Sequence, residues 1–271
     1  MDEIISIEKF AGIIEKLNNK GPSQFLFRGC GNVDYKLLPS LYRHKSVTSV
    51  ADILDLEKKI FERFIVRCVP FLEKNYDTNS EKYWPFLFLM QHFGVPTRLL
   101  DWSENPYVAL YFALTSANFD DKTKTYKQDA AFWILDAKSW NENVINKKQF
   151  YDGEILHPGS LYLNGYKPCT IMEHFQELPL AMFGDYNSQR IVAQRGAFTI
   201  FGSNLTGMEH IAEQKTELKS TLIKYTISKD NIPALLNSLL LIGITDSVVF
   251  PSLEGLSKEL KRHFKFEVGY V

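Results

Sequence analysis

The middle of the chain, Gly94 to Leu114, joins an apolar strand pattern directly to an apolar helix pattern. Leu99 and Leu100 lie between polar ends, which predicts a short buried strand over residues 97–102. Ser103 as the cap, followed three residues later by a proline, is typical of a helix start. The apolar positions that follow recur at helical spacing: Val108, Ala109, Phe112 and Ala113. We therefore expect a helix that packs on the strand.

The junction between this strand and this helix is polar and contains Arg98, Asp101, Trp102 and Ser103. A helix N-terminus presents free N–H groups and the positive end of the helix dipole, so it favours an anion. The pattern makes the junction a candidate ligand site.

The rest of the chain shows both the helical and the strand period. Helices are predicted over residues 5–17, 50–72, 83–93, 231–241 and 255–263, and strands over residues 24–27, 130–136 and 222–227. Residues 18–23, 32–43 and 120–128 are interpreted as loops or turns, and residues 139–163 as loop with short helical pieces.

Two late segments also have apolar, β-branched patterns. Ile191 to Phe201 is interpreted as two short strand pieces hinged at Gly196, or as one bulged strand, and Ser247 to Pro251 as the end of a strand. The fold class we expect is α+β, a single domain over residues 1–271. It should have a mixed central sheet and an N-terminal helical insertion at about residues 45–93.

Composition excludes several classes of protein. The 271 residues are 45% hydrophobic with a formal net charge of −1, which excludes a disordered chain and argues against bulk electrostatic binding of nucleic acid. The three cysteines have no metal-ligand spacing. The N-terminus has no signal-peptide pattern and no apolar run reaches membrane-spanning length, so we expect a cytoplasmic protein that does not engage a membrane.

Arg28 is the first candidate for ligand binding, because it ends an apolar strand and precedes Gly29, which lets a ligand approach the backbone. A guanidinium fits phosphate oxygens in a bidentate way, although an arginine there is as often part of a structural ion pair. Asp101 lies among apolar residues and must be paired if it is buried, with Arg98 or Arg28 as partner.

Gln194 and Arg195 interrupt an apolar segment with polar side chains, which favours a functional role there. His92 ends an apolar helix and is more often a satisfied core residue than a catalytic one. No metal site, glycine-rich phosphate loop or nucleophile elbow is found in the sequence. We expect Arg28, Arg98, Asp101, Ser103 and Gln194 to converge on one pocket.

Five motifs along the chain resemble the FRG-domain family, named for a Phe-Arg-Gly segment that is here Phe27 to Gly29. They are FLFRG, LLPSLYR (Leu37 to Arg43), LMQHFGVPTRLLDWSENPYVALYFAL, RIVAQRGAFTIFG and GITDSVVFPSLEGL. Their order is that of the family.

A looser resemblance is to ADP-ribosyltransferases of the arginine–serine–glutamate type, which carry an aromatic-Arg-Gly first strand. This resemblance implies an ADP-ribosyltransferase-like fold with NAD as the substrate. Gln194 stands where that type has a glutamate, and residues 101–103 replace its serine–threonine–serine triplet.

The chemistry of NAD binding and cleavage suggests a role for each candidate residue. The diphosphate would be held by Arg28, with Gly29 and Arg98 beside it, and a ring of the ligand would stack on Trp102 or Tyr111. Ser103 would orient the amide or a ribose, and Gln194 would bond a ribose hydroxyl. Asp101 or His92 would accept a proton as positive charge develops on the ribose.

Our leading hypothesis is an NAD-binding effector that transfers ADP-ribose to a nucleic acid or protein, or cleaves NAD, in toxin action or anti-phage defence. The alternative is a non-catalytic sensor of a nucleotide or a nucleic-acid end, acting through Arg28, Arg98 and Arg195. In a third interpretation all five motifs are structural and the function lies in a protein–protein surface. The sequence leaves the acceptor and the oligomeric state open.

Overall fold

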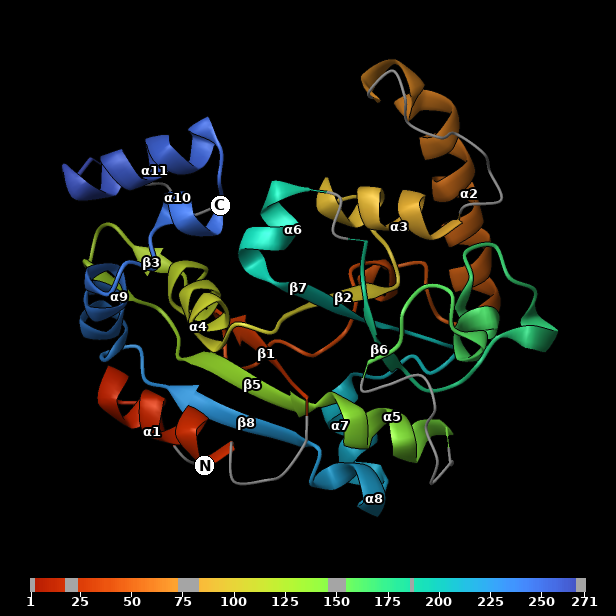
Figure 1. Ribbon diagram of the computed structural model, residues 1–271, viewed down its shortest axis with the longest axis horizontal. Helices are drawn as coiled ribbons and strands as arrows, with labels where there is room; N and C mark the ends of the chain where they lie inside the picture. Colours follow the sequence, from red (N-terminus) through yellow and green to blue (C-terminus); the bar gives the residue numbers. More distant parts are fainter. Residues whose placement is uncertain (1–2, 18–23, 73–82, 146–154, 186–187, 267–271) are drawn as a thin grey trace.

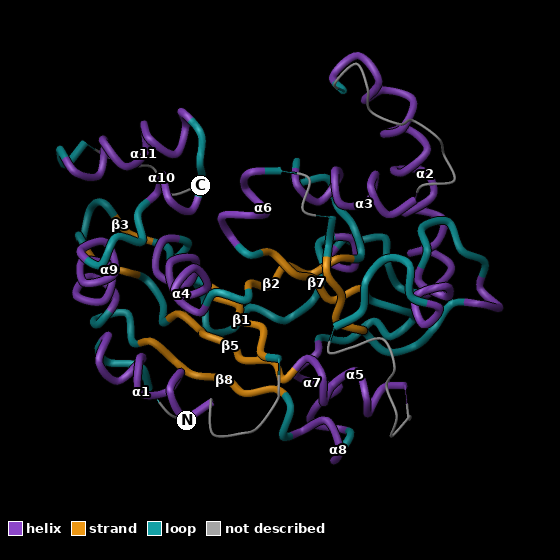
Figure 2. The backbone as a smooth tube through the Cα atoms, in the orientation of Figure 1, coloured by secondary structure: helices purple, strands orange, loops and turns teal. Residues whose placement is uncertain are grey.

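The computed structural model describes residues 3–17, 24–72, 83–145, 155–185 and 188–266. The loop expected over residues 18–23 and part of the segment 139–163 lie outside the described residues. Within the described part, a central sheet is covered by helices on both faces (Figures 1 and 2).

The sheet has six strands in the order β6-β7-β2-β1-β5-β8. The strands are β1 (Phe25–Cys30), β2 (Leu99–Ser103), β5 (Ala130–Asp136), β6 (Leu180–Phe183), β7 (Gly196–Ile200) and β8 (Leu222–Ile227). All neighbouring pairs are antiparallel, and the parallel pairing found in the described residues is limited to two isolated bridges. The α+β class is confirmed, and the sheet is mostly antiparallel where we expected a mixed one.

One face of the sheet is covered by α1 (Ile7–Leu17), α4 (Pro106–Thr115) and α9 (Ile232–Leu241). Figure 1 shows these three helices together on the left. Helix α4 lies against β1 at Gly29, where an added Cβ would be 1.9 Å from the carbonyl oxygen of Ala109. Only glycine permits this close approach, so Gly29 fixes where the helix crosses the strand.

The other face carries α5 (Ala137–Ile145), α7 (Met208–Gln214), α8 (Thr216–Lys219) and the 3-10 helix η2 (Leu41–Arg43). Two further 3-10 helices, η4 (Leu161–Tyr166) and η5 (Met172–His174), precede β6. A two-stranded hairpin, β3 (Phe119–Asp120) and β4 (Thr125–Tyr126), lies where a polar loop was predicted.

The predicted helical insertion is found between β1 and β2. It consists of α2 (Val50–Cys68), the 3-10 turn η3 (Val69–Phe71) and α3 (Tyr83–His92). A capping box starts α2, because the Ser49 side chain accepts from the Asp52 N–H and the Asp52 carboxylate accepts from the Ser49 N–H. Hydrogen bonds from the Thr48 N–H and from the Ser49 and Thr48 hydroxyls lower the pKa of Asp52 to about 2. No helix in the described ranges is both long and apolar enough to cross a membrane.

Two predicted strand segments are helices. Residues 189–194 form α6 (Gln189–Gln194), which the Ser188 side chain caps and the left-handed backbone of Arg195 ends, and only the part from Gly196 onward is a strand. Residues 246–249 form α10 (Asp246–Val249), which packs on the last helix, α11 (Leu253–His263). In both segments the β-branched residues suggested strands, and capping and tertiary packing outweighed that weak propensity.

The start of α4 also differs from the prediction. Its cap is Asn105, whose side-chain oxygen accepts from the N–H groups of Tyr107 and Val108, while Ser103 ends β2.

Candidate functional site

Strands β1 and β2 separate after a single pair, Phe27 with Ser103. Continued antiparallel pairing would place Gly29 opposite Asp101, and that pair is not formed. The Arg28 side chain occupies the opening, and its Nη1 donates to the main-chain carbonyl oxygen of Asp101 at 2.5 Å. A side chain therefore takes the place of a backbone partner at this point of the sheet, and the sheet is open beside it.

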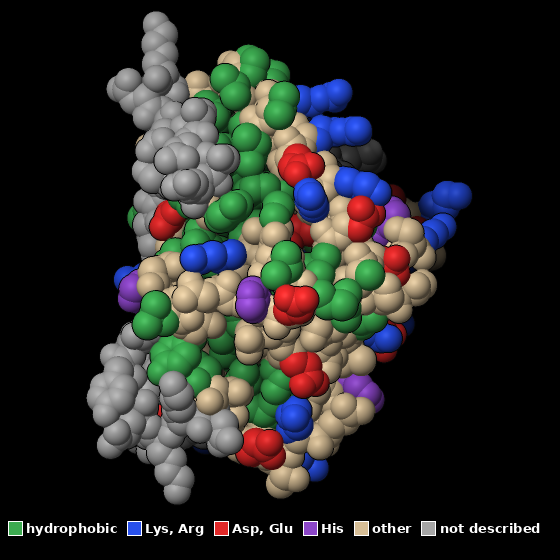
Figure 3. All heavy atoms as spheres, turned by 90° about the vertical axis from the view of Figure 1, so that its right-hand side faces the viewer, with side chains coloured by type: hydrophobic (Ala, Val, Ile, Leu, Met, Phe, Trp, Pro, Cys, Tyr) green, Lys and Arg blue, Asp and Glu red, His purple; other side chains and the backbone are tan. Residues whose placement is uncertain are grey.

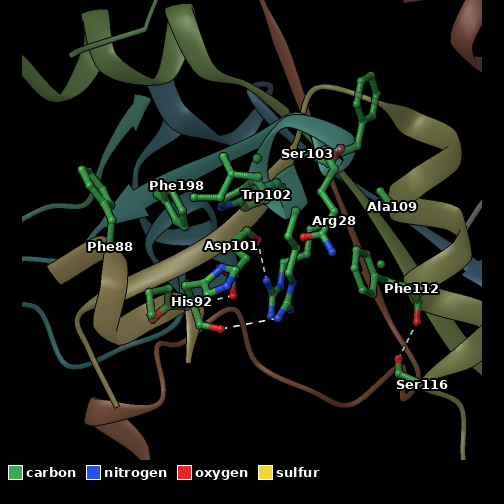
Figure 4. Close-up of a pocket in the computed structure, with 17 residues that line it drawn as sticks. Arg28, Phe88, His92, Asp101, Trp102, Ser103, Ala109, Phe112, Ser116 and Phe198 are labelled. Carbon is green, nitrogen blue, oxygen red and sulfur yellow. Dashed lines mark hydrogen bonds between the residues drawn. The ribbon is translucent and has the colours of Figure 1, made fainter. Parts of the chain in front are cut away.

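A cavity of about 240 Å³ lies at this opening, bounded by β1, β2, α3, α4, α6 and β7. Figure 4 shows Arg28 in the middle of it, with His92 and Asp101 on one side and Ala109 and Phe112 on the other. Most of the predicted residues line it: Arg28, Gly29, His92, Asp101, Trp102, Ser103 and Gln194. Arg98 and Tyr111 do not line it.

Arg28 is the cationic centre of the cavity. Its Nη1 is bonded to Asp101, but its buried Nε has no hydrogen-bond partner among the described residues. A buried N–H without an acceptor is costly, and an anionic ligand would remove that cost. Arg28 therefore forms no structural ion pair with a described residue.

Asp101 is exposed, although it lies between buried neighbours on β2. Its Oδ2 accepts a hydrogen bond from the Gln91 side chain at 2.9 Å, and Gln91 is held in turn by the Thr97 hydroxyl. We expected a buried Asp101 to pair with an arginine. The carboxylate is exposed instead, and Arg28 donates to the main-chain oxygen of Asp101. The carboxylate therefore faces the cavity with an amide as its partner.

The assignment of Arg98 to ligand binding is corrected by its position. Arg98 is fully buried, and its Nε donates to Glu57 Oε1 at 2.7 Å. Its other nitrogens donate to the carbonyl oxygens of Phe201 and Tyr166, each at 2.7 Å. Burial lowers the pKa of Arg98, but the charge and hydrogen bond of Glu57, together with Tyr42 and Tyr166, outweigh burial and the pKa is raised. This pair ties the insertion to the sheet.

Neither aromatic side chain proposed for stacking offers an open ring face: Tyr111 does not line the cavity, and Trp102 lines it but is almost fully buried. Trp102 is 4% exposed and its ring packs in the core of the opposite face, where its indole N–H bonds the Thr199 hydroxyl. Tyr111 is buried between α4 and α10 and donates to Asp246 Oδ1 at 2.6 Å. Burial and this hydrogen bond raise the pKa of Tyr111.

Ser103 and Gln194 meet at the edge of the cavity. The Ser103 hydroxyl donates to the main-chain oxygen of Gln194 at 2.6 Å and accepts from the Asn105 N–H at 2.9 Å. Ser103 thereby joins β2 to the end of α6, and its contact with a ribose or an amide stays a prediction. The Gln194 side-chain N–H₂ group donates to the carbonyl oxygen of Val249 at 3.2 Å. That bond uses the side-chain nitrogen and leaves the amide oxygen as an acceptor.

His92 ends α3 at the cavity. Partial burial, together with the nearby charge of Arg190, lowers its pKa below the ordinary value of 6.5. His92 is therefore neutral at pH 7 and able to accept a proton.

Sequence reasoning missed Gln91 and Arg190. Arg190 lines the cavity from α6 and its guanidinium lies 5.1 Å from the centre of the Phe250 ring. Had residues 189–194 been recognised as helical, the i,i+4 spacing of Arg190 and Gln194 would have placed both on one face. Gln91 could have been found as the polar neighbour of His92 in an otherwise apolar helix.

Two further hollows adjoin the cavity. One, of about 580 Å³, shares Arg28, Gln91, His92, Asp101 and Arg190 with it. The other, of about 600 Å³, shares His92 and Arg190 and extends toward Phe250 and Lys258. We call them the Arg43 hollow and the Lys258 hollow, after a cation that lines each. In the described ranges, no group of three or more His, Cys, Asp or Glu residues could hold a metal ion.

Residues 23–122 match the family model of the FRG domain, which confirms the resemblance to that family over this stretch. The matched stretch contains Arg28, His92 and Asp101, while Arg190 and Gln194 come from outside it. No curated protein and no solved structure gives a significant match.

Proposed function

We propose that the cavity binds NAD or a closely related nucleotide, with Arg28 holding the diphosphate. The observation that carries this proposal is the buried Arg28 Nε, which lacks an acceptor in the described structure and lies at an open cavity. A guanidinium presents its N–H groups in a fixed fork, which matches phosphate oxygens better than it matches a single carbonyl.

The cavity is large enough for one half of a dinucleotide but not for the whole molecule. Ligand sites are commonly about 300–1,000 Å³, and the cavity of about 240 Å³ is smaller than this range. It has room for the nicotinamide ring and its ribose, while the rest of a dinucleotide needs an adjoining hollow. Phe88, Phe112 and Phe198 give the cavity apolar walls suited to a ring.

The groups around Arg28 also support cleavage of the nicotinamide bond. Breaking the bond between the nicotinamide nitrogen and ribose C1′ sends the electron pair to nicotinamide and leaves positive charge on the ribose. The Asp101 carboxylate would stabilise that charge. Water or an acceptor group then attacks C1′, and its proton passes to Asp101 or to neutral His92. The Gln194 amide oxygen would accept from a ribose hydroxyl.

In this proposal the protein is an ADP-ribosyltransferase or an NAD glycohydrolase, acting as an effector in toxin action or anti-phage defence. A protein or nucleic-acid acceptor would receive the ADP-ribose in the first case. On the face drawn in Figure 3, basic side chains lie among acidic and hydrophobic ones. That mixture does not favour a nucleic-acid backbone over a compact nucleotide as the primary ligand.

A second candidate function is nucleotide sensing without turnover. It is favoured by Gln194, because an amide occupies the position where the transferase resemblance calls for a carboxylate. Arg98 is buried and Arg195 lies outside the cavity, so a sensor would use Arg28 and Arg190.

The deciding experiment combines calorimetric titration of the whole chain with NAD and an assay of nicotinamide release. The assay is run with and without cell extract, which supplies an acceptor. Binding with release supports the enzyme, and tight binding without release supports the sensor. Absence of both binding and release would reject the proposal and leave a protein–protein surface as the site of function.

A further inference from the structure

The Arg43 hollow carries the last residue of the LLPSLYR motif, which the proposed function has not used. Within that motif Leu37, Leu41 and Tyr42 are buried, and the Tyr42 hydroxyl donates to the Gly202 carbonyl oxygen at 2.5 Å. Arg43 instead is exposed and lines the hollow. Its side chain has no hydrogen bond or ion pair to any described residue, and only its backbone N–H is used, in a bond to the Ser40 carbonyl oxygen. Its neighbours therefore anchor the turn, and Arg43 is the member of the motif that is free to bind.

An exposed aromatic ring lies on the same hollow. Phe93 follows the last residue of α3 and is 70% exposed, and its ring meets His92 edge-on with centroids 4.8 Å apart. An edge-on contact covers at most one face of the Phe93 ring, so at least one face is open. The left-handed Gly94 ends the helix directly after it, with φ of +74°, so the backbone on which Phe93 sits is fixed.

The hollow adjoins the cavity at Arg28. Both spaces are lined by Arg28 and Asp101, so a ligand whose diphosphate lies on Arg28 can extend from one into the other. The Arg43 hollow carries three arginines, Arg28, Arg43 and Arg190, against the single carboxylate of Asp101. The surplus of positive charge suits a phosphate group, and the hollow of about 580 Å³ has room for an adenosine.

We infer that the Arg43 hollow is the subsite for the adenosine monophosphate half of the ligand, with Arg43 on its phosphate and Phe93 stacked on adenine. The inference rests on the proposed function and makes it specific, because the ligand must then be a dinucleotide. The Lys258 hollow is the competing location. It is the weaker one, because its aromatic ring, Phe250, already has both Arg190 and Lys258 over it, at 5.1 and 5.7 Å.

The test compares NAD with nicotinamide mononucleotide, which lacks the adenosine half, by calorimetric titration of the whole chain. Wild type should bind NAD more tightly than the mononucleotide. Phe93→Ala and Arg43→Gln should each raise the Kd for NAD about tenfold, as expected for a lost stack or a lost charged hydrogen bond. Neither should change the Kd for the mononucleotide, and Arg43→Lys should recover part of the loss.

Matched controls come from the same chain. Phe71→Ala removes another exposed ring, which is 87% exposed, and Arg63→Gln removes another exposed arginine. Neither residue lines the cavity or either hollow, so neither change should alter the affinity for NAD. All four positions are exposed, and unchanged melting temperatures will show that the variants are folded.

Two results would overturn the subsite while leaving the proposed function standing. One is equal affinity of wild type for NAD and the mononucleotide. The other is a selective loss of NAD affinity in Lys258→Gln, with none in Arg43→Gln, which would move the adenosine to the Lys258 hollow. If wild type binds neither compound, the proposed function fails and the subsite fails with it.

Discussion

The Nη1 of Arg28 donates to the main-chain oxygen of Asp101 across the gap where β1 and β2 no longer pair. One hydrogen bond thus holds together the cation and the carboxylate-bearing residue of the site. It uses the backbone of Asp101, so the two side chains do not neutralise each other. Both charges stay available to a ligand.

The first prediction concerns the guanidinium. Arg28→Ala should weaken NAD binding by about 2–3 kcal/mol, because charged hydrogen bonds to phosphate are lost. Arg28→Lys should restore only part of this, since lysine supplies the charge without the fork. Calorimetry measures the affinity and thermal denaturation the stability. Unchanged affinity would remove Arg28 from the site, and a large fall in melting temperature would assign it a structural role.

The second prediction separates catalysis from binding. Asp101→Asn keeps the shape of the side chain but removes its charge. It should lower nicotinamide release about 100- to 10,000-fold. NAD affinity should stay within about tenfold, or 1.4 kcal/mol. A variant that releases nicotinamide at the wild-type rate would exclude the carboxylate from the reaction. Glu104→Gln, at the half-buried bend between β2 and α4, is the control for a lost negative charge near the helix start.

The third prediction is a pH dependence from His92. Its pKa is lower in the folded protein than the ordinary 6.5, so the unfolded chain binds more protons as pH falls through this range. Stability should therefore fall as pH drops below about 6.5, until pH reaches the folded pKa. His92→Gln should flatten that part of the curve in urea denaturation. If His92 also accepts the proton, the rate should lose its acidic inflection in the same variant.

The fourth prediction tests the buried pair Glu57–Arg98. Glu57→Gln leaves the buried guanidinium without its counter-charge and should lower the free energy of unfolding by about 3–5 kcal/mol. Glu62 lies on the same helix in an exposed i,i+4 pair with Lys58 at 3.9 Å. Glu62→Gln should cost less than about 0.5 kcal/mol. Equal effects of the two changes in chemical denaturation would contradict the structural role of Arg98.

The fifth prediction concerns the two roles considered for Gly29. Gly29→Ala would place a Cβ against the Ala109 oxygen and the Ala113 nitrogen, so α4 must shift at a cost of about 1–3 kcal/mol. Gly12 in α1 has nothing within 4 Å of an added Cβ, and Gly12→Ala should raise stability by about 0.5–1 kcal/mol. A neutral Gly29→Ala in chemical denaturation would contradict the packing role.

Local sequence patterns were sufficient to predict most of the helices and strands. The apolar period of residues 130–136 predicted β5, and the amphipathic period of residues 50–72 predicted α2 together with η3. Periodicity records which face a segment buries, so it identifies elements whose packing partner covers a whole face. It failed for α6 and α10, which are six and four residues long. Such short helices depend on capping and on their neighbours.

The residues of the candidate site were also predicted only in part. The FRG motif singled out Arg28, and the polar interruption of an apolar strand singled out Asp101; both line the cavity. The same kind of interruption singled out Arg98, which is buried against Glu57, 41 residues earlier in the chain. A sequence shows that a charge interrupts an apolar segment, but whether its partner is a carboxylate or a ligand depends on residues far away along the chain.

The sequence by itself determined the α+β class, the FRG domain and the apolar faces of its elements, because these depend on residue type and local spacing. Only the tertiary structure decided that β1 and β2 separate after Phe27, and that Arg28 fills the opening. Strand divergence is set by what packs between two strands that are about 70 residues apart, and by the α6 helix that arrives about 90 residues later still. No local pattern records that geometry, and it is the geometry that makes the cavity.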